Sequence, residues 1–175
     1  MASEQRMGRT QILPVTETVF GMEYSVHDCP KRYKDDMVAM FPGIATTGIL
    51  IIPTCQNSEV DLVRVGEEVE IEKDRLLERF CEWAKAVCEK LDKKGFWSDY
   101  LDPCSGLPVR TREGQVVYSE VDALSTLLGF ATANAGCCKV VLHPKWGSSI
   151  YPATMFTKAP LEELQMAIEE VASEQ

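Results

Sequence analysis

The chain carries, at residues 134–147, the segment Asn134-Ala-Gly-Cys-Cys-Lys-Val-Val-Leu-His-Pro-Lys-Trp-Gly147. Its apolar centre predicts a strand over residues 137–143. Successive side chains of a strand point to opposite faces. One face then holds Cys138, Val140 and Leu142, and the other holds Cys137, Lys139, Val141 and His143. We therefore predict that Cys138 is a core residue and that Cys137 is an accessible thiol beside the Lys139 cation.

The rest of the chain mixes strand and helix patterns without a regular alternation. Runs of apolar, β-branched and aromatic residues predict strands at residues 16–26, 47–55, 60–65, 116–118 and 150–157. Apolar residues at helical spacing predict helices at residues 30–41, 73–94, in a segment ending near 128 and at 160–171. Gly95 follows the longest of these helices and is expected to cap it. This mixture predicts an α+β domain with a mainly antiparallel sheet.

The length and composition are those of one globular domain. The chain has 175 residues, 45% of them hydrophobic, which suffices for one core. We assign residues 1–15 to a flexible N-terminal tail and residues 16–175 to a single domain. No apolar stretch approaches the roughly 20 residues that a membrane-spanning helix needs. The net charge of −9 disfavours binding to nucleic acid and to anionic membranes.

The cysteines indicate a reducing compartment. Their number, seven, is odd, and residues 1–12 lack the apolar run of a secretory signal. We therefore predict a cytoplasmic location, while Arg6 and Arg9 leave a mitochondrial location open although the segment forms no clear presequence.

The adjacent cysteines permit three chemistries: a redox disulfide, a metal site or a single thiolate ligand. Strand alternation would point the two sulfur atoms apart, which weakens the redox interpretation. No Cys-x-x-Cys pair occurs, so zinc motifs of that kind are absent. A cation favours the thiolate, so Lys139 would make Cys137 a better ligand for a soft metal. The alternative that both cysteines only fill a strand stays open, since free cysteine is often buried.

Other catalytic motifs are missing. The glycines do not follow Walker or Rossmann spacing, and no Ser-His-Asp elbow is present. His27 and His143 are the only histidines, and His143 could as easily cap a loop as assist Cys137.

Three segments together resemble a known family. They are Glu67-Glu-Val-Glu-Ile-Glu-Lys-Asp-Arg-Leu-Leu-Glu-Arg-Phe80, Gly95-Phe-Trp-Ser-Asp-Tyr-Leu-Asp-Pro-Cys-Ser-Gly-Leu107, and Gly136-Cys-Cys-Lys-Val140 with Trp146-Gly147. The chain is similar, over roughly residues 18–170, to the C-terminal domain of the CblD family of cobalamin trafficking proteins (methylmalonic aciduria and homocystinuria type D). The resemblance implies a nitroreductase-like sandwich, with the sheet flanked by helices, that has neither flavin nor enzymatic activity.

The resemblance also implies a partner and a ligand. Family members form a heterodimer with a CblC-type cobalamin-processing protein. The first cysteine of the pair, Cys137 here, supplies a thiolate to the cobalt of the cobalamin held in that complex. We assign Lys139 to the same cofactor-binding site because strand alternation places it on the face of Cys137. The implied recipient is methionine synthase. Methylmalonyl-CoA mutase is the second recipient in longer members, whose N-terminal extension carries mitochondrial targeting.

Overall fold

The fold is built on one antiparallel sheet, seen in a computed structural model that describes residues 10–18, 20–114 and 116–174. Its strands lie in the order β1-β2-β3-β7-β4, and every neighbouring pair is antiparallel. They span Gln11–Glu17 (β1), Met22–Asp28 (β2), Leu50–Asn57 (β3), Ile150–Thr157 (β7) and Ser98–Tyr100 (β4). The prediction of an α+β domain with a mainly antiparallel sheet is confirmed.

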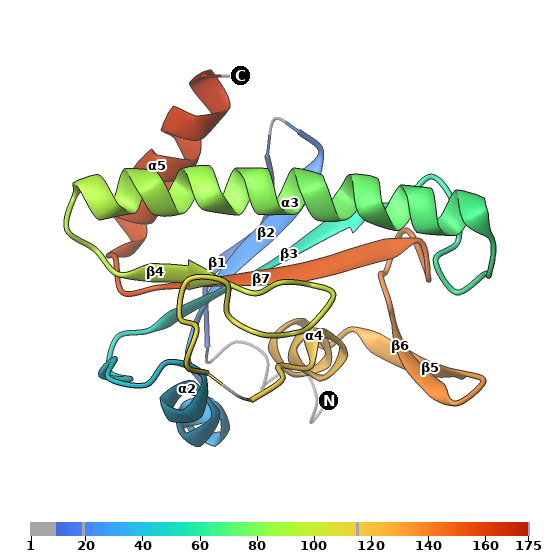
Figure 1. Cartoon of the computed structure of the whole chain (residues 1–175), viewed down its shortest axis with the longest axis horizontal. Helices are drawn as coiled ribbons and strands as arrows, with labels where there is room; N and C mark the ends of the chain where they lie inside the picture. Colours follow the sequence, from blue (N-terminus) through green and yellow to red (C-terminus); the bar gives the residue numbers. More distant parts are fainter. Residues whose placement is uncertain (1–9, 19, 115, 175) are drawn as a thin grey trace.

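Helices cover both faces of the sheet (Figure 1). On one face lie α3 (Glu67–Lys93) and α5 (Leu161–Ser173), and on the other lie α2 (Lys34–Met40), which follows the short 3-10 helix η1 (Lys31–Tyr33), and α4 (Glu120–Leu128). Alternate residues of β3 serve the two faces: Ile52 packs under α3 and α5, and Ile51 packs under α2 and α4. Within the described residues, no helix is both long and apolar enough to cross a membrane.

A separate two-stranded hairpin projects from this body (Figure 1). It consists of β5 (Ala131–Ala135) and β6 (Cys138–Leu142), paired antiparallel, with Gly136 and Cys137 forming the turn between them. The hairpin leaves the body after α4 and returns to it just before β7. Its tip carries the two adjacent cysteines, because Cys137 lies in the turn and Cys138 begins β6.

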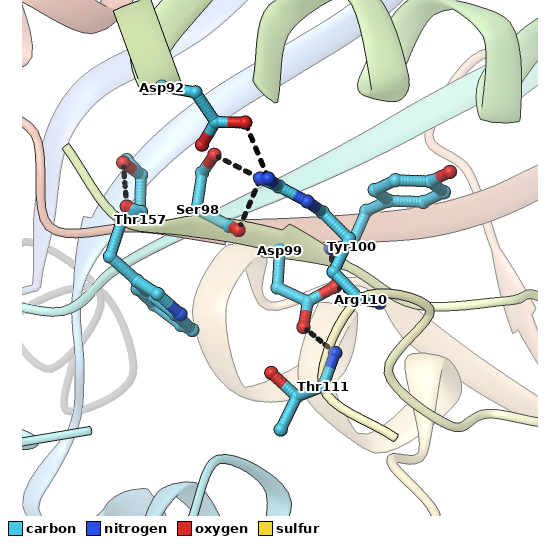
Figure 2. A network of polar contacts seen from close by, with 8 residues as sticks. Asp92, Ser98, Asp99, Tyr100, Arg110, Thr111 and Thr157 are labelled. Carbon is cyan, nitrogen blue, oxygen red and sulfur yellow. Dashed lines mark hydrogen bonds and ion pairs between the residues drawn. The ribbon is translucent and has the colours of Figure 1, made fainter. Parts of the chain in front are cut away.

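The long loop after β4 is held by a buried carboxylate. Asp99 is fully buried and accepts hydrogen bonds from the backbone N–H groups of Tyr100 (2.7 Å), Arg110 (3.0 Å) and Thr111 (2.8 Å). The Arg110 side chain turns the other way and bonds to Ser98 and Asp92 (Figure 2). This network of hydrogen bonds joins the loop to β4 and to the end of α3.

Helix predictions hold better than strand predictions. The helix predicted at 73–94 is α3 but begins six residues earlier, at Glu67. Gly95 caps it as expected, with φ of +80° and hydrogen bonds from Gly95 N to Asp92 O (2.9 Å) and from Phe96 N to Leu91 O (3.0 Å). The remaining three predicted helices correspond to η1 with α2, to α4 and to α5.

Several strand boundaries are wrong. The strand predicted at 16–26 is two strands, β1 and β2, joined by a turn, and β1 includes residues 11–15 that were assigned to the tail. The part of that tail at residues 1–9 lies outside the described residues. Residues 60–65 are a loop, in which Val65 is completely exposed, and the described residues at 116–118 are not a strand.

Candidate functional site

The tip of the hairpin exposes two sulfur atoms. Gly136 adopts φ of +63°, a left-handed conformation that glycine accommodates without strain, and it reverses the chain before Cys137. Cys137 and Cys138 are both exposed, and their Sγ atoms lie 4.0 Å apart. The prediction of an accessible Cys137 is confirmed. The predictions that Cys138 is a core residue and that the two sulfurs point apart are wrong, because Cys137 belongs to the turn and not to the strand.

The two thiols interact electrostatically. The hydrogen bond with Cys137, followed by the Coulomb effect of that same residue, raises the pKa of Cys138 above its ordinary value. A second negative charge beside an existing one is disfavoured. Two neighbouring thiolates are therefore disfavoured, so one sulfur of the pair keeps its proton while the other is ionised.

Lys139 pairs with a carboxylate of α4. Its Nζ donates a hydrogen bond to Oδ1 of Asp122, in the first turn of α4, at 3.0 Å. This contact, with a second hydrogen bond from Ser119, lowers the pKa of Asp122. The predicted placement of Lys139 beside the Cys137 thiol is corrected accordingly: the lysine ties the hairpin to α4.

At the end of β6 nearest the body, the buried face is the one that was predicted to mix polar and apolar residues. Val141 is 4% exposed and packs with Cys55, Leu124 and Ile150, whereas Val140 and Leu142 on the opposite face are partly exposed. His143 lies on the same buried face as Val141, at the end of the strand remote from Cys137. It therefore belongs to the base of the hairpin and cannot assist the thiol.

The other cysteines occupy different environments. Burial raises the pKa of the Cys29, Cys81 and Cys88 thiols to about 11 and raises that of Cys55 further. Cys104 is exposed, and partial desolvation raises the pKa of its thiol as well. In the part of the chain that the structure describes, no three His, Cys, Asp or Glu side chains gather to hold a metal ion.

A polar cleft of about 430 Å³ adjoins the hairpin. It lies between α2, α4 and Lys139, and its charged lining residues are Arg32, Asp36, Asp122 and Lys139. Tyr118 forms part of its wall. No local sequence pattern predicts this cleft, because its walls come from segments about 100 residues apart.

Glu120, which follows the lining residue Ser119 in the chain, carries a buried carboxyl group. Oε2 of Glu120 accepts a hydrogen bond from the Thr154 hydroxyl, while Oε1 is buried and finds no hydrogen-bond partner among the residues that the structure describes. Burial raises the pKa of Glu120 to about 7, and the bond from Thr154 opposes that rise only in part. The hydroxyl of Tyr118 is also buried without a partner. Sequence reasoning missed this group, since a glutamate at a helix start ordinarily faces solvent.

Comparisons with known proteins agree with the resemblance. A family model described as methylmalonic aciduria and homocystinuria type D protein matches residues 3–169. Proteins named cobalamin trafficking protein CblD are similar over 138 residues: those of Rattus norvegicus and Homo sapiens are each 35% identical, and that of Gallus gallus is 32% identical. These alignments cover 79% of this chain and 47% of each relative, so the chain spans about half the length of the curated relatives it matches. The chain belongs to the methylmalonic aciduria and homocystinuria type D protein family.

Proposed function

We propose that this chain is a non-enzymatic adaptor in cobalamin trafficking that presents the Cys137 thiolate to the cobalt of cobalamin. One observation carries the proposal: Cys137 is exposed in the turn of a hairpin that projects from the body (Figure 1). A ligand at the end of an arm can reach a metal that another protein holds. The relatives' name, cobalamin trafficking protein, supports the same role.

The chemistry required of Cys137 is ligand exchange. The Cys137 thiol would lose its proton to water, and its thiolate would bind cobalt in exchange for a water ligand, so no change of oxidation state would be needed. Sulfur suits transition metals of this kind better than it suits magnesium or calcium. Cys138 remains protonated beside the ligand because Cys137 raises its pKa. Lys139 contributes to cofactor binding indirectly, by tying the hairpin to α4 through Asp122.

The partner in this proposal is a CblC-type cobalamin-processing protein, which holds the corrin ring while Cys137 approaches the metal. The heterodimer would serve methionine synthase, with methylmalonyl-CoA mutase as a second recipient. We place this activity in the cytoplasm. The sheet with helices on both faces is compatible with a nitroreductase-like sandwich that has lost its flavin, and that specific likeness is part of the proposal.

A visible absorption spectrum tests the proposal. The chain is mixed with a cobalamin-loaded CblC-type protein, and complex formation is followed in parallel by gel filtration. We expect a new cobalt–sulfur band with the native chain and with Cys138→Ser, and no band with Cys137→Ser although that variant still forms the complex. If both single variants retain the band, the assignment of Cys137 is wrong.

A second candidate, a thiol oxidoreductase, is favoured by the 4.0 Å between the two sulfur atoms. In that reaction the two thiols would lose two electrons and two protons to a low-molecular-weight disulfide, which becomes two thiols as a Cys137–Cys138 bond forms. The Cα atoms of adjacent residues are only ~3.8 Å apart, below the usual ~4.4–6.8 Å, so this bond would be strained and readily reduced. Peptide mass spectrometry would detect the bond, and turnover would require both cysteines.

A further inference from the structure

We infer that His143, clamped by Glu23, is the positioning residue of the Cys137 hairpin. The inference rests on the proposed function, in which Cys137 must meet a metal held by another molecule. His143 does not touch the thiol; it acts through the hairpin that carries it.

The hairpin needs such an anchor because little of it is buried. Residues 131–134 of β5 and residues 138–139 of β6 are exposed, and Val141 is the one residue within these two strands that is fully buried. An isolated two-stranded hairpin is at best marginally stable in water. The Lys139–Asp122 pair is more than half exposed on both sides, so solvent screening leaves it little stabilising effect. The direction of the hairpin therefore depends on its base.

The imidazole ring of His143 links the base to the central sheet. Its Nδ1 accepts hydrogen bonds from the backbone N–H groups of Lys145 (3.0 Å) and Trp146 (3.3 Å). An acceptor at Nδ1 places the ring hydrogen on Nε2, which donates to Oε2 of Glu23 at 2.8 Å. Glu23 belongs to β2, so this bond joins the hairpin to a strand inside the sheet. The His143 side chain is 4% exposed and that of Glu23 is 15% exposed, which shields the bond from water.

The same ring touches both ends of the hairpin. Phe130, the residue before β5, meets it edge-on with ring centroids 5.3 Å apart. Trp146, in the turn after β6, stacks on it at 3.8 Å with an interplanar angle of 11°. The backbone of His143 closes that turn through two hydrogen bonds of 2.9 Å with Gly147. His143 therefore fixes where the hairpin leaves the body and where it returns.

Because the hairpin is long, a small rotation at its base displaces its tip by several ångströms. Five strand residues, Cys138–Leu142, lie between Cys137 and His143. The six residue steps from His143 to Cys137 make an arm of about 20 Å, so a rotation of about 10° at the base moves the thiol by roughly 3 Å. Bond formation tolerates far less, since misplacement of a reacting group by about 1 Å can reduce a rate roughly a hundredfold. The hydrogen bond between His143 and Glu23 at the base therefore determines how often the Cys137 thiol is positioned to bind the metal.

The test alters Glu23, which lies outside the hairpin and on a different strand. Glu23→Ala removes the acceptor for His143, and Glu23→Gln retains an oxygen acceptor in its place. Ser25→Ala is the matched control, because it breaks a buried hydrogen bond of the same strand, to His27, that does not involve the hairpin. Hydrogen exchange of the amides of residues 131–142 reports the order of the hairpin in the free protein. Formation of the cobalt–sulfur band with a cobalamin-loaded CblC-type partner reports the position of the thiol.

With Glu23→Ala we expect hairpin exchange to accelerate at least about tenfold and the band to form roughly ten- to a hundredfold more slowly. Alkylation of Cys137 by iodoacetamide should keep its native rate, because the thiol itself is unchanged. Glu23→Gln should show hairpin exchange and band formation close to those of the native chain. Ser25→Ala should show neither change, even where its thermal stability is lowered as much as that of Glu23→Ala.

The inference would be overturned if the hairpin amides of Glu23→Ala exchanged at the native rate. It would also be overturned if Ser25→Ala changed exchange and band formation as much as Glu23→Ala does. If the native chain itself gives no band, the proposed function fails, and hydrogen exchange still decides the role of His143 in the hairpin.

Discussion

The Sγ atom of Cys137 lies 4.0 Å from the Sγ atom of Cys138, and both side chains are exposed at the tip of the β5–β6 hairpin. Strand alternation would have placed one sulfur inside and one outside. The turn at Gly136 and Cys137 brings them to the same surface instead. The two residues are therefore a coupled pair, in which one thiol can act as a ligand while the other stays protonated.

This coupling predicts the behaviour of each single variant. In Cys137→Ser the contact that raises the pKa of Cys138 is lost, so that pKa should fall toward its ordinary value and Cys138 should react faster with iodoacetamide near pH 8. The buried Cys55 and Cys88 should react far more slowly in the folded protein and serve as internal controls. An unchanged or slower reaction of Cys138 would contradict the coupling.

The Lys139–Asp122 pair predicts that Lys139 stabilises the hairpin and does not activate the thiol. Lys139→Gln and Asp122→Asn should each lower the free energy of unfolding by less than ~1 kcal/mol, and the double variant by less than the sum. The pH profile of Cys137 alkylation should be the same in all of these proteins. A profile that shifts with Lys139→Gln but not with Asp122→Asn would show that the lysine acts on the thiol directly.

Glu120 predicts a pH dependence of stability. Burial raises its pKa from 4.5 to about 7, so the folded state holds this proton more tightly than the unfolded state does. The stabilising effect of protonation is complete below about pH 4.5, declines as the pH rises toward 7 and is absent above it. Glu120→Gln, which stays neutral, should therefore be more stable than the native protein at pH 8, by on the order of 2 kcal/mol, with a smaller difference at pH 5.

Urea denaturation at several pH values measures this difference. The exposed Glu78→Gln is the control and should show no pH-dependent gain. A constant difference between Glu120→Gln and the native protein from pH 5 to pH 8 would contradict the account.

Asp99 predicts a large loss of stability on truncation. Asp99→Ala removes the acceptor of three N–H groups, the buried one of Tyr100 and the partly buried ones of Arg110 and Thr111. This loss should cost about 3 kcal/mol of unfolding free energy. Asp92→Ala also breaks a bond to Arg110, but at the surface, and should cost less than ~1 kcal/mol. Urea denaturation of the two variants tests this contrast (Figure 2), and equal losses would contradict it.

The helices were predictable because their signals are local. Apolar residues at helical spacing and the Gly95 cap identified α3, although its first turn, rich in glutamate and poor in apolar residues, was missed. Glutamate there matches the positive end of the helix dipole, and that signal was available in the sequence.

The strands were harder because their burial depends on neighbours that local patterns do not contain. Val60, Val63 and Val65 have strand propensity, but no partner strand covers them and Val65 is fully exposed. In the hairpin, β5 is composed of alanine, threonine and asparagine, which give little strand signal. A shift of one residue reverses the two faces of a strand, and the start of β6 at Cys138 was decided by the turn.

Of the candidate site, the sequence indicated the chemistry but not the geometry. It singled out Cys137 and the hairpin segment, and the family resemblance supplied the metal. The partner of Lys139, the buried Glu120 and the Glu23–His143 bond each join residues that are distant in the chain, so no local pattern could have revealed them.

X-ray absorption at the cobalt edge tests the central claim most directly, because it reports which atoms are bonded to the metal. The sample is the complex of this chain with a CblC-type protein carrying cobalamin, prepared with the native chain, Cys137→Ser and Cys138→Ser. We predict one sulfur neighbour of cobalt in the native and Cys138→Ser complexes and none in the Cys137→Ser complex. A sulfur neighbour that persists in Cys137→Ser, or that is missing from the native complex, would contradict the assignment of Cys137 as the cobalt ligand.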